Sequence, residues 1–159
     1  MNWYSTSGSI RPRAESWDGP NFRLFQCGID YIDKQLPPHR LFLDAMDPEG
    51  GWLYVLSGSL QYTIGGDRYR IERGQALVTR KPDPGTIIRS GADEPLHSIW
   101  INVTGESALR MFDYLHLKYG QIQNLPINCA AVRQGKRLIK LAHDGPVNSA
   151  HFWSEQTFK

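Results

Sequence analysis

The stretch that decides the fold covers residues 52–78. It begins WLYVLSGSLQYTIGG (52–66) and continues, after Asp67 and Arg68, as YRIERGQALV (69–78). Short runs of apolar, β-branched and aromatic residues alternate here with glycine turns. Gly65 and Gly66 supply the positive φ angles that a tight hairpin turn needs. Strand, turn, strand, hairpin and return strand follow one another with no room for a helix, which indicates antiparallel β structure.

Runs of the same kind extend the pattern on both sides of this stretch. Together they predict strands over 22–29, 40–46, 51–56, 59–64, 67–71, 75–79, 86–90 and 96–103. Pro82 and Pro84 exclude a central strand over 81–85, because proline cannot donate to a strand ladder. Short, evenly spaced strands without intervening helices favour a mainly β sandwich or barrel.

Helical periodicity begins only after Gly105. The pattern predicts a helix from Ser107 to a stop at Gly120, an irregular connection over 121–129, a helix over 130–143, and a third helix from Asn148 or Ser149. The chain thus divides into an N-terminal arm (1–20), a β-barrel domain (21–104) and a helical segment (105–159). The last helix still carries apolar residues at the end without a C-cap, so we expect the chain to be a piece of a longer protein.

Composition sets limits on function. The 159 residues are 40% hydrophobic, which is enough apolar material for a core. Lys+Arg is 18 and Asp+Glu is 16, so the net charge of +2 is too balanced to imply nucleic-acid or membrane binding by itself. The start does not resemble a signal peptide, and the longest apolar run, 52–56, is too short to cross a bilayer. We expect a cytoplasmic protein in which Cys27 and Cys129 are buried free thiols.

Four landmarks occur in order along the chain: YVLSG (54–58), the Gly-Gly turn (65–66), GQALV (74–78) and a Pro-Gly loop (81–85). They resemble the cupin family, and most closely the N-terminal sensor domains of AraC-family transcription regulators. HSIWINVTG (97–105) is similar to that family's last barrel strand, which carries a tryptophan and ends at a glycine. The resemblance implies a cupin-like double-stranded β-helix, a jelly-roll barrel, followed by C-terminal helices. It also implies a small-molecule effector and a helical dimerisation segment.

The ligands of metal-binding cupins have no counterpart here. Those proteins place His-x-His and Glu after the first glycine and another His after the Pro-Gly loop. This chain has Trp52 and Tyr54 near the first position and Ile87-Ile88 at the second. An Fe, Mn or Zn ion needs three or four converging ligands. We therefore expect a metal-free barrel, no cofactor and no catalytic residues.

A metal-free barrel of this kind is wide enough to enclose one small ligand. Ser98 and Trp100 share a strand face, as do Trp52 and Tyr54. A tryptophan with nearby polar groups suits a monosaccharide, which has flat C–H faces and many hydroxyls. The resemblance points to Ser98 and Trp100 as pocket lining and to Arg40 as the arginine before the YVLSG strand. The predicted ligand-binding residues are Arg40, Trp52, Tyr54, Ser98 and Trp100, with barrel filling as the alternative for the aromatic ones.

The helix over 130–143 has an apolar stripe made of Val132, Leu138, Leu141 and Ala142. Such a stripe faces either a partner or the barrel of its own chain, and both remain open. The resemblance favours a homodimer through these residues, with DNA bound only through a C-terminal domain outside this chain. The sequence shows no basic helix with suitable polar base readers, and its net charge is near neutral, so we expect no sequence-specific DNA binding by residues 1–159.

The leading prediction is the effector-sensing and dimerisation domain of an AraC-type regulator. One alternative is a stand-alone metal-free cupin enzyme, of the sugar isomerase or epimerase type. It needs a general base near the pocket, for which His39, Asp44 and Glu49 are the candidates. Another is a carbohydrate-binding module that neither catalyses nor regulates.

Overall fold

The computed structural model describes residues 23–32, 39–40, 49–80, 87–90 and 94–144. In chain order its elements are β1 (Arg23–Ile32), β2 (His39–Arg40), β3 (Glu49–Ser57), β4 (Ser59–Ile64), β5 (Asp67–Glu72), β6 (Gln75–Arg80), β7 (Ile87–Ser90), β8 (Leu96–Thr104), α1 (Glu106–Tyr119), β9 (Ile122–Asn124) and α2 (Ala130–Asp144). No helix in these ranges is long and apolar enough to span a bilayer.

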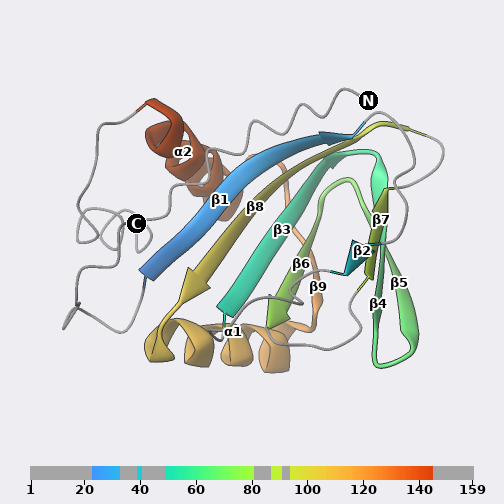
Figure 1. Ribbon diagram of the computed structural model, residues 1–159, viewed down its shortest axis with the longest axis horizontal. Helices are drawn as coiled ribbons and strands as arrows, with labels where there is room; N and C mark the ends of the chain where they lie inside the picture. Colours follow the sequence, from blue (N-terminus) through green and yellow to red (C-terminus); the bar gives the residue numbers. More distant parts are fainter. Residues whose placement is uncertain (1–22, 33–38, 41–48, 81–86, 91–93, 145–159) are drawn as a thin grey trace.

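The strands form two antiparallel sheets (Figure 1). One has the order β1-β8-β3-β6-β9 and the other the order β2-β7-β4-β5. Apart from β9, this distribution of strands over two sheets is that of a jelly roll, in which two Greek keys interlock. The predicted fold class, a mainly β, cupin-like double-stranded β-helix followed by α-helices, is therefore confirmed.

Local turn chemistry explains why the strands lie where the sequence predicts them. Gly65 and Gly66 take φ angles of 57° and 91° and close the β4–β5 hairpin. Gly58 and Gly74, at 72° and 85°, turn the chain between β3 and β4 and between β5 and β6. Each of these φ values suits glycine, which has no Cβ to clash. Of the strand predicted over 40–46, only Arg40 lies within the described residues.

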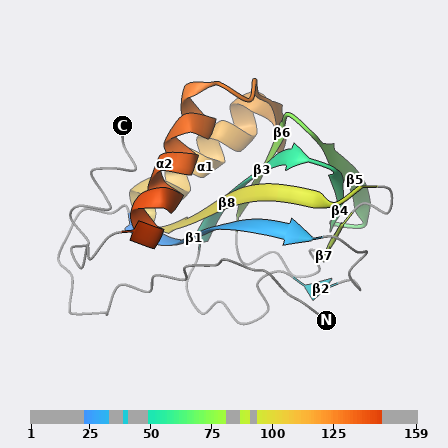
Figure 2. The ribbon, with the colours of Figure 1, turned by 90° about the horizontal axis from the view of Figure 1, so that it is seen from above.

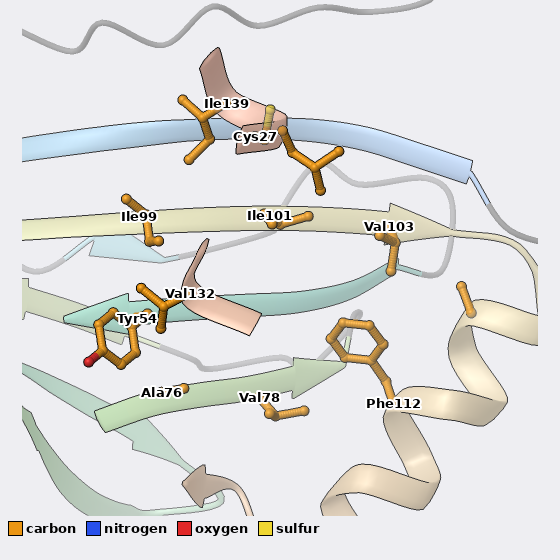
Figure 3. Close-up of a cluster of buried hydrophobic side chains, with 12 residues drawn as sticks. Cys27, Tyr54, Ala76, Val78, Ile99, Ile101, Val103, Phe112, Val132 and Ile139 are labelled. Atoms are coloured by element: carbon orange, nitrogen blue, oxygen red, sulfur yellow. The ribbon is translucent and has the colours of Figure 1, made fainter. Parts of the chain in front are cut away.

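The molecule has three layers, because the five-stranded sheet is covered on both faces (Figure 2). Towards the four-stranded sheet, Val55, Leu77 and Leu96 pack with Leu60, Tyr62 and Ile71. On the opposite face a second cluster packs against both helices (Figure 3). We call the first surface of the five-stranded sheet its inner face and the second its helix face.

Each helix packs closely on the helix face because a glycine lies opposite a large aromatic ring at the contact. The Phe112 ring of α1 lies against Gly50, where a Cβ would come within 2.7 Å of the ring. Gly135 of α2 lies over Trp52, where a Cβ would come within 3.2 Å. Both helices begin and end within one residue of their predicted limits, and Gly120 ends α1 with an N–H bonded to the His116 carbonyl.

The connection over 121–129 is not irregular throughout, as the sequence predicted. Residues 122–124 form β9, which pairs with the free edge of β6 through Leu77↔Ile122 and Gln75↔Asn124. Three residues are too few to show a period of two, so nothing in the sequence distinguishes this strand from a loop. The predicted arm (1–20) and the third helix lie outside the described residues.

Candidate ligand-binding site

A group of polar side chains lies on the inner face of the five-stranded sheet. Ser98, Trp100 and Asn102 occupy alternate positions of β8 and so point to the same face of the sheet. Residues on the neighbouring strands pair with these positions and share that face. Asp30 of β1 pairs with Ser98, and Thr79 of β6 lies in the same row as Asn102 through Gly51. Because paired residues share a sheet face, all five side chains belong to one surface. We call it the polar stripe: Asp30, Thr79, Ser98, Trp100 and Asn102.

Trp100 is the large aromatic group of the polar stripe, and two neighbours on β1 fix its position. Its Nε1–H donates a hydrogen bond to Asp30 Oδ1 at 3.1 Å. Its ring occupies the space beside Gly28, where a Cβ would come within 2.7 Å of Cζ2. The indole is only partly buried. The arrangement therefore holds an aromatic surface in one orientation with part of it accessible.

Ser98 stands in the row next to Trp100 and is unusual for a buried polar residue. Its side chain is 0% exposed. Its Oγ has no hydrogen-bond partner among the residues that the structure describes. An unsatisfied buried hydroxyl costs about 1–3 kcal/mol. A polar ligand group that reached Oγ would recover that cost.

The other end of the polar stripe is built around Gly51. Thr79 Oγ1 donates to the Gly51 carbonyl at 3.4 Å. A Cβ on Gly51 would lie 2.5 Å from Thr79 Oγ1. The Asn102 Oδ1 atom would be 3.2 Å from that Cβ. Thr79 and Asn102 are both 8% exposed. Glycine at 51 thus makes room for a hydroxyl and an amide side by side on the inner face.

The structure brings together only some of the predicted ligand-binding residues. Ser98 and Trp100 share the inner face, whereas Trp52 and Tyr54 lie on the helix face. The Trp52 and Tyr54 rings stack with centroids 5.9 Å apart. Trp52 contacts α2 at Gly135, and the Tyr54 Oη donates to the Leu125 carbonyl at 3.0 Å. Burial raises the pKa of the Tyr54 phenol. These two aromatic residues pack beneath the helices, on the sheet face opposite to Ser98 and Trp100, so they neither line the inner face with those residues nor fill the barrel between the two sheets.

Arg40 is placed by its backbone alone. It pairs with Ile87 where β2 meets β7, at the edge of the four-stranded sheet. Its side chain lies outside the described residues, as do those of the alternative catalytic candidates His39 and Glu49 and the whole of Asp44. The predicted contact of Arg40 with a ligand therefore stays a prediction.

The residues predicted for dimerisation lie mostly in the core of their own chain. Val132 and Leu138 are 0% and 2% exposed and belong to the cluster between α2 and the helix face. Leu141 packs partly buried against the same cluster, and the Ala142 side chain lies outside the described residues. The sequence left open whether this stripe faces a partner or the barrel of its own chain. Val132 and Leu138 pack against the barrel of their own chain.

Three residues of the polar stripe, Asp30, Thr79 and Asn102, were not among the predicted ligand-binding residues. The signal for Asp30 was present in the alternation of β1, where Cys27, Ile29 and Tyr31 are apolar while Gly28 and Asp30 are not. A glycine directly before a polar residue of the same face is typical of a close approach by another group. Across the described ranges, no group of three or more His, Cys, Asp or Glu side chains is placed to hold one metal ion.

The sequence matches the model of a known protein family. The model of the AraC-like ligand binding domain family matches residues 26–151. That range includes the whole polar stripe and both helices, and it covers most of the chain. The protein therefore belongs to the AraC-like ligand binding domain family.

Solved structures with a similar arrangement are distant in sequence. The protein YhaK from Escherichia coli is 15% identical, with a TM-score of 0.48 over 82% of this chain and 53% of its own. This chain thus spans about half the length of YhaK. A cupin protein from Bacteroides fragilis is 21% identical, with a TM-score of 0.39 over 58% of this chain and 73% of its own. Among curated proteins, no sequence matches significantly.

Proposed function

We propose that this chain is the effector-sensing domain of an AraC-type transcription regulator and that the polar stripe binds a small polyhydroxylated molecule such as a monosaccharide. The observation that carries the proposal is the indole of Trp100, anchored by Asp30 beside the buried, unpartnered hydroxyl of Ser98. An anchored indole offers a flat surface to the C–H face of a sugar ring. The hydroxyls of that sugar find acceptors and donors in Asp30, Ser98 and Asn102.

Binding to this site needs no metal and no cofactor, and no residue of the polar stripe has a catalytic role in the proposal. The effector acts by favouring one arrangement of the domain over another, since only a difference in affinity shifts such an equilibrium. Strand β3 links the two surfaces. Leu53 lies on its inner face opposite Trp100, and Trp52 lies on its helix face against α2. A shift of β3 on binding would therefore reach the helical layer.

The proposal includes a cytoplasmic homodimer that contacts its operator through a DNA-binding domain outside this chain. Because Val132 and Leu138 are used internally, the dimer needs another surface. The described residues offer one on α1, where Met111, Tyr114 and Leu117 are 38%, 54% and 84% exposed. Exposed apolar side chains in a row are typical of a contact surface.

The test is isothermal titration of residues 1–159 with a panel of neutral pentoses and hexoses. We expect Trp100→Ala to weaken binding by at least about 10-fold, which corresponds to about 1.4 kcal/mol. Asp30→Asn keeps an acceptor for the indole, so it should weaken binding less than Asp30→Leu does. Trp52→Phe, on the helix face, is the matched control and should leave affinity within about 2-fold.

Two outcomes would contradict the proposal: no member of the panel binds, or Trp100→Ala binds as tightly as the wild type. Turnover of a bound sugar, lost when His39 is replaced, would favour the enzyme instead. Binding that changes neither oligomeric state nor helix exposure would favour a carbohydrate-binding module.

A further inference from the structure

The solvent side of α2 carries a row of positive charges that the proposed effector site does not use. Arg133, Lys136, Arg137 and Lys140 are all exposed. Their spacing of three and four residues places them within an arc of about 100° on the helix, over a length of about 10 Å. We call these four residues the basic row. The opposite side of α2 is held against the helix face by Leu138 and Gly135, so the orientation of the basic row is fixed.

The basic row is unfavourable for the helix that carries it. Like charges three or four residues apart repel each other, and Arg133–Arg137 and Lys136–Lys140 are both at the i,i+4 spacing. The first turn of α2 contains no acidic residue, although a helix N-terminus favours negative charge. Arg133 donates to the Asn128 carbonyl, and the part of the chain described here contains no ion pair to any of the four. Helix stability therefore does not explain the row.

We infer that the basic row contacts the phosphate backbone of double-stranded DNA. Duplex DNA carries one negative charge per about 1.7 Å of its axis, and a linear row of exposed cations complements it. The row does not suit a membrane, because an interfacial helix needs its apolar face free and the apolar face of α2 is buried. A protein interface needs an apolar or aromatic centre, and the only other exposed side chains described on α2 are those of Ala130 and Ala131.

The contact would supply affinity without sequence readout, since phosphate contacts carry no base information. It agrees with the expectation that this chain does not recognise a DNA sequence, and it is independent of the proposed effector. The near-neutral charge of +2 for the whole chain does not oppose it, because the potential near α2 depends on how the cations are distributed.

The experiment is fluorescence anisotropy of residues 1–159 with a labelled mixed-sequence duplex of about 20 base pairs, at salt concentrations from about 25 to about 150 mM. Four phosphate contacts predict a slope of log K against log salt of about −3.6. The variant K136Q/R137Q/K140Q should lower affinity at the lowest salt by about 10-fold or more and reduce the slope by about 2.7.

The matched control is R68Q/R70Q/R73Q, which removes the same charge from exposed side chains on and after β5. It should change affinity by less than about 3-fold. All six side chains are exposed, so both variants should keep the far-UV circular dichroism of the wild type. Three results would overturn the inference: no DNA binding at about 25 mM salt, an equal loss in both variants, or equally tight binding to polyglutamate or to phosphatidylserine vesicles.

Discussion

At Gly28, a hydrogen in place of a side chain decides where the indole of Trp100 lies. A Cβ there would come within 2.7 Å of Cζ2, closer than packed carbon atoms allow. We expect Gly28→Ala to displace the indole and lower the free energy of unfolding by about 1–3 kcal/mol. Urea unfolding measures this loss. In the double variant with Trp100→Ala the clash is absent, so the two effects should not add; strict additivity would contradict the contact.

Cys27, on the helix face of β1, gives the protein a specific sensitivity to alkaline pH. Its side chain is 3% exposed, and burial raises the pKa of the thiol from 9.0 to about 11. The thiol of Cys27 has a higher pKa in the folded state than in the unfolded state. Its contribution to the free energy of unfolding is therefore fully present below pH 9 and is lost as the pH rises from 9 to about 11. The expected loss is on the order of 3 kcal/mol.

Urea unfolding of the wild type and Cys27→Ala over this pH range isolates the contribution of the thiol from those of tyrosine and lysine. The stability difference between the two proteins should narrow as the pH rises. A constant difference would show that Cys27 keeps its ordinary pKa.

The apolar stripe of α2 shows that the sequence pattern of a helix is the same whether its apolar side packs on its own chain or on a partner. This stripe covers the helix face, with Leu138 at 2% exposure. We expect Leu138→Ala to cost about 2–5 kcal/mol of unfolding free energy, independent of protein concentration. Lys136→Ala, on the solvent side of the same helix, should stay within about 0.5 kcal/mol. Thermal unfolding at two concentrations measures both, and a destabilisation by Leu138→Ala that changes with protein concentration would assign the stripe to a dimer interface instead.

Strand β3 explains why alternation alone misplaced two aromatic residues. It is central in the five-stranded sheet and is covered on both sides, so Leu53 and Val55 on one face are as apolar as Trp52 and Tyr54 on the other. Alternation then separates two faces without saying which one looks into the barrel. Strand β8 was easier to interpret, because Ser98 and Asn102 mark one of its faces as polar.

For the molecule as a whole, the exposed side of α1 is where we expect two copies to meet. Leu117→Glu places a charge at the most exposed position of the apolar row formed by Met111, Tyr114 and Leu117, and should convert a dimer into a monomer in sedimentation experiments. Stability should change by no more than about 0.5 kcal/mol, because Leu117 is 84% exposed. Ile127→Glu, at 46% exposure and outside both helices, is the control. A dimer that survives Leu117→Glu must use another surface.

The sequence by itself determined the strands, turns, helix limits and the family. Those features depend on residues close together in the chain: glycines at positive φ, a period of two, a period of 3.6 and a helix stop. The spacing of the basic row is local in the same sense, because its four residues lie within the eight positions 133–140.

Only the tertiary structure decided which residues form the site and which cover the sheet. The Asp30–Trp100 hydrogen bond joins residues 70 positions apart, and β9 joins an edge strand far from it in sequence. The covering of Val132 and Leu138 likewise depends on a sheet built from the first two thirds of the chain. Such pairings follow from strand register and from competition between buried faces, and neither is encoded by the neighbours of a single residue.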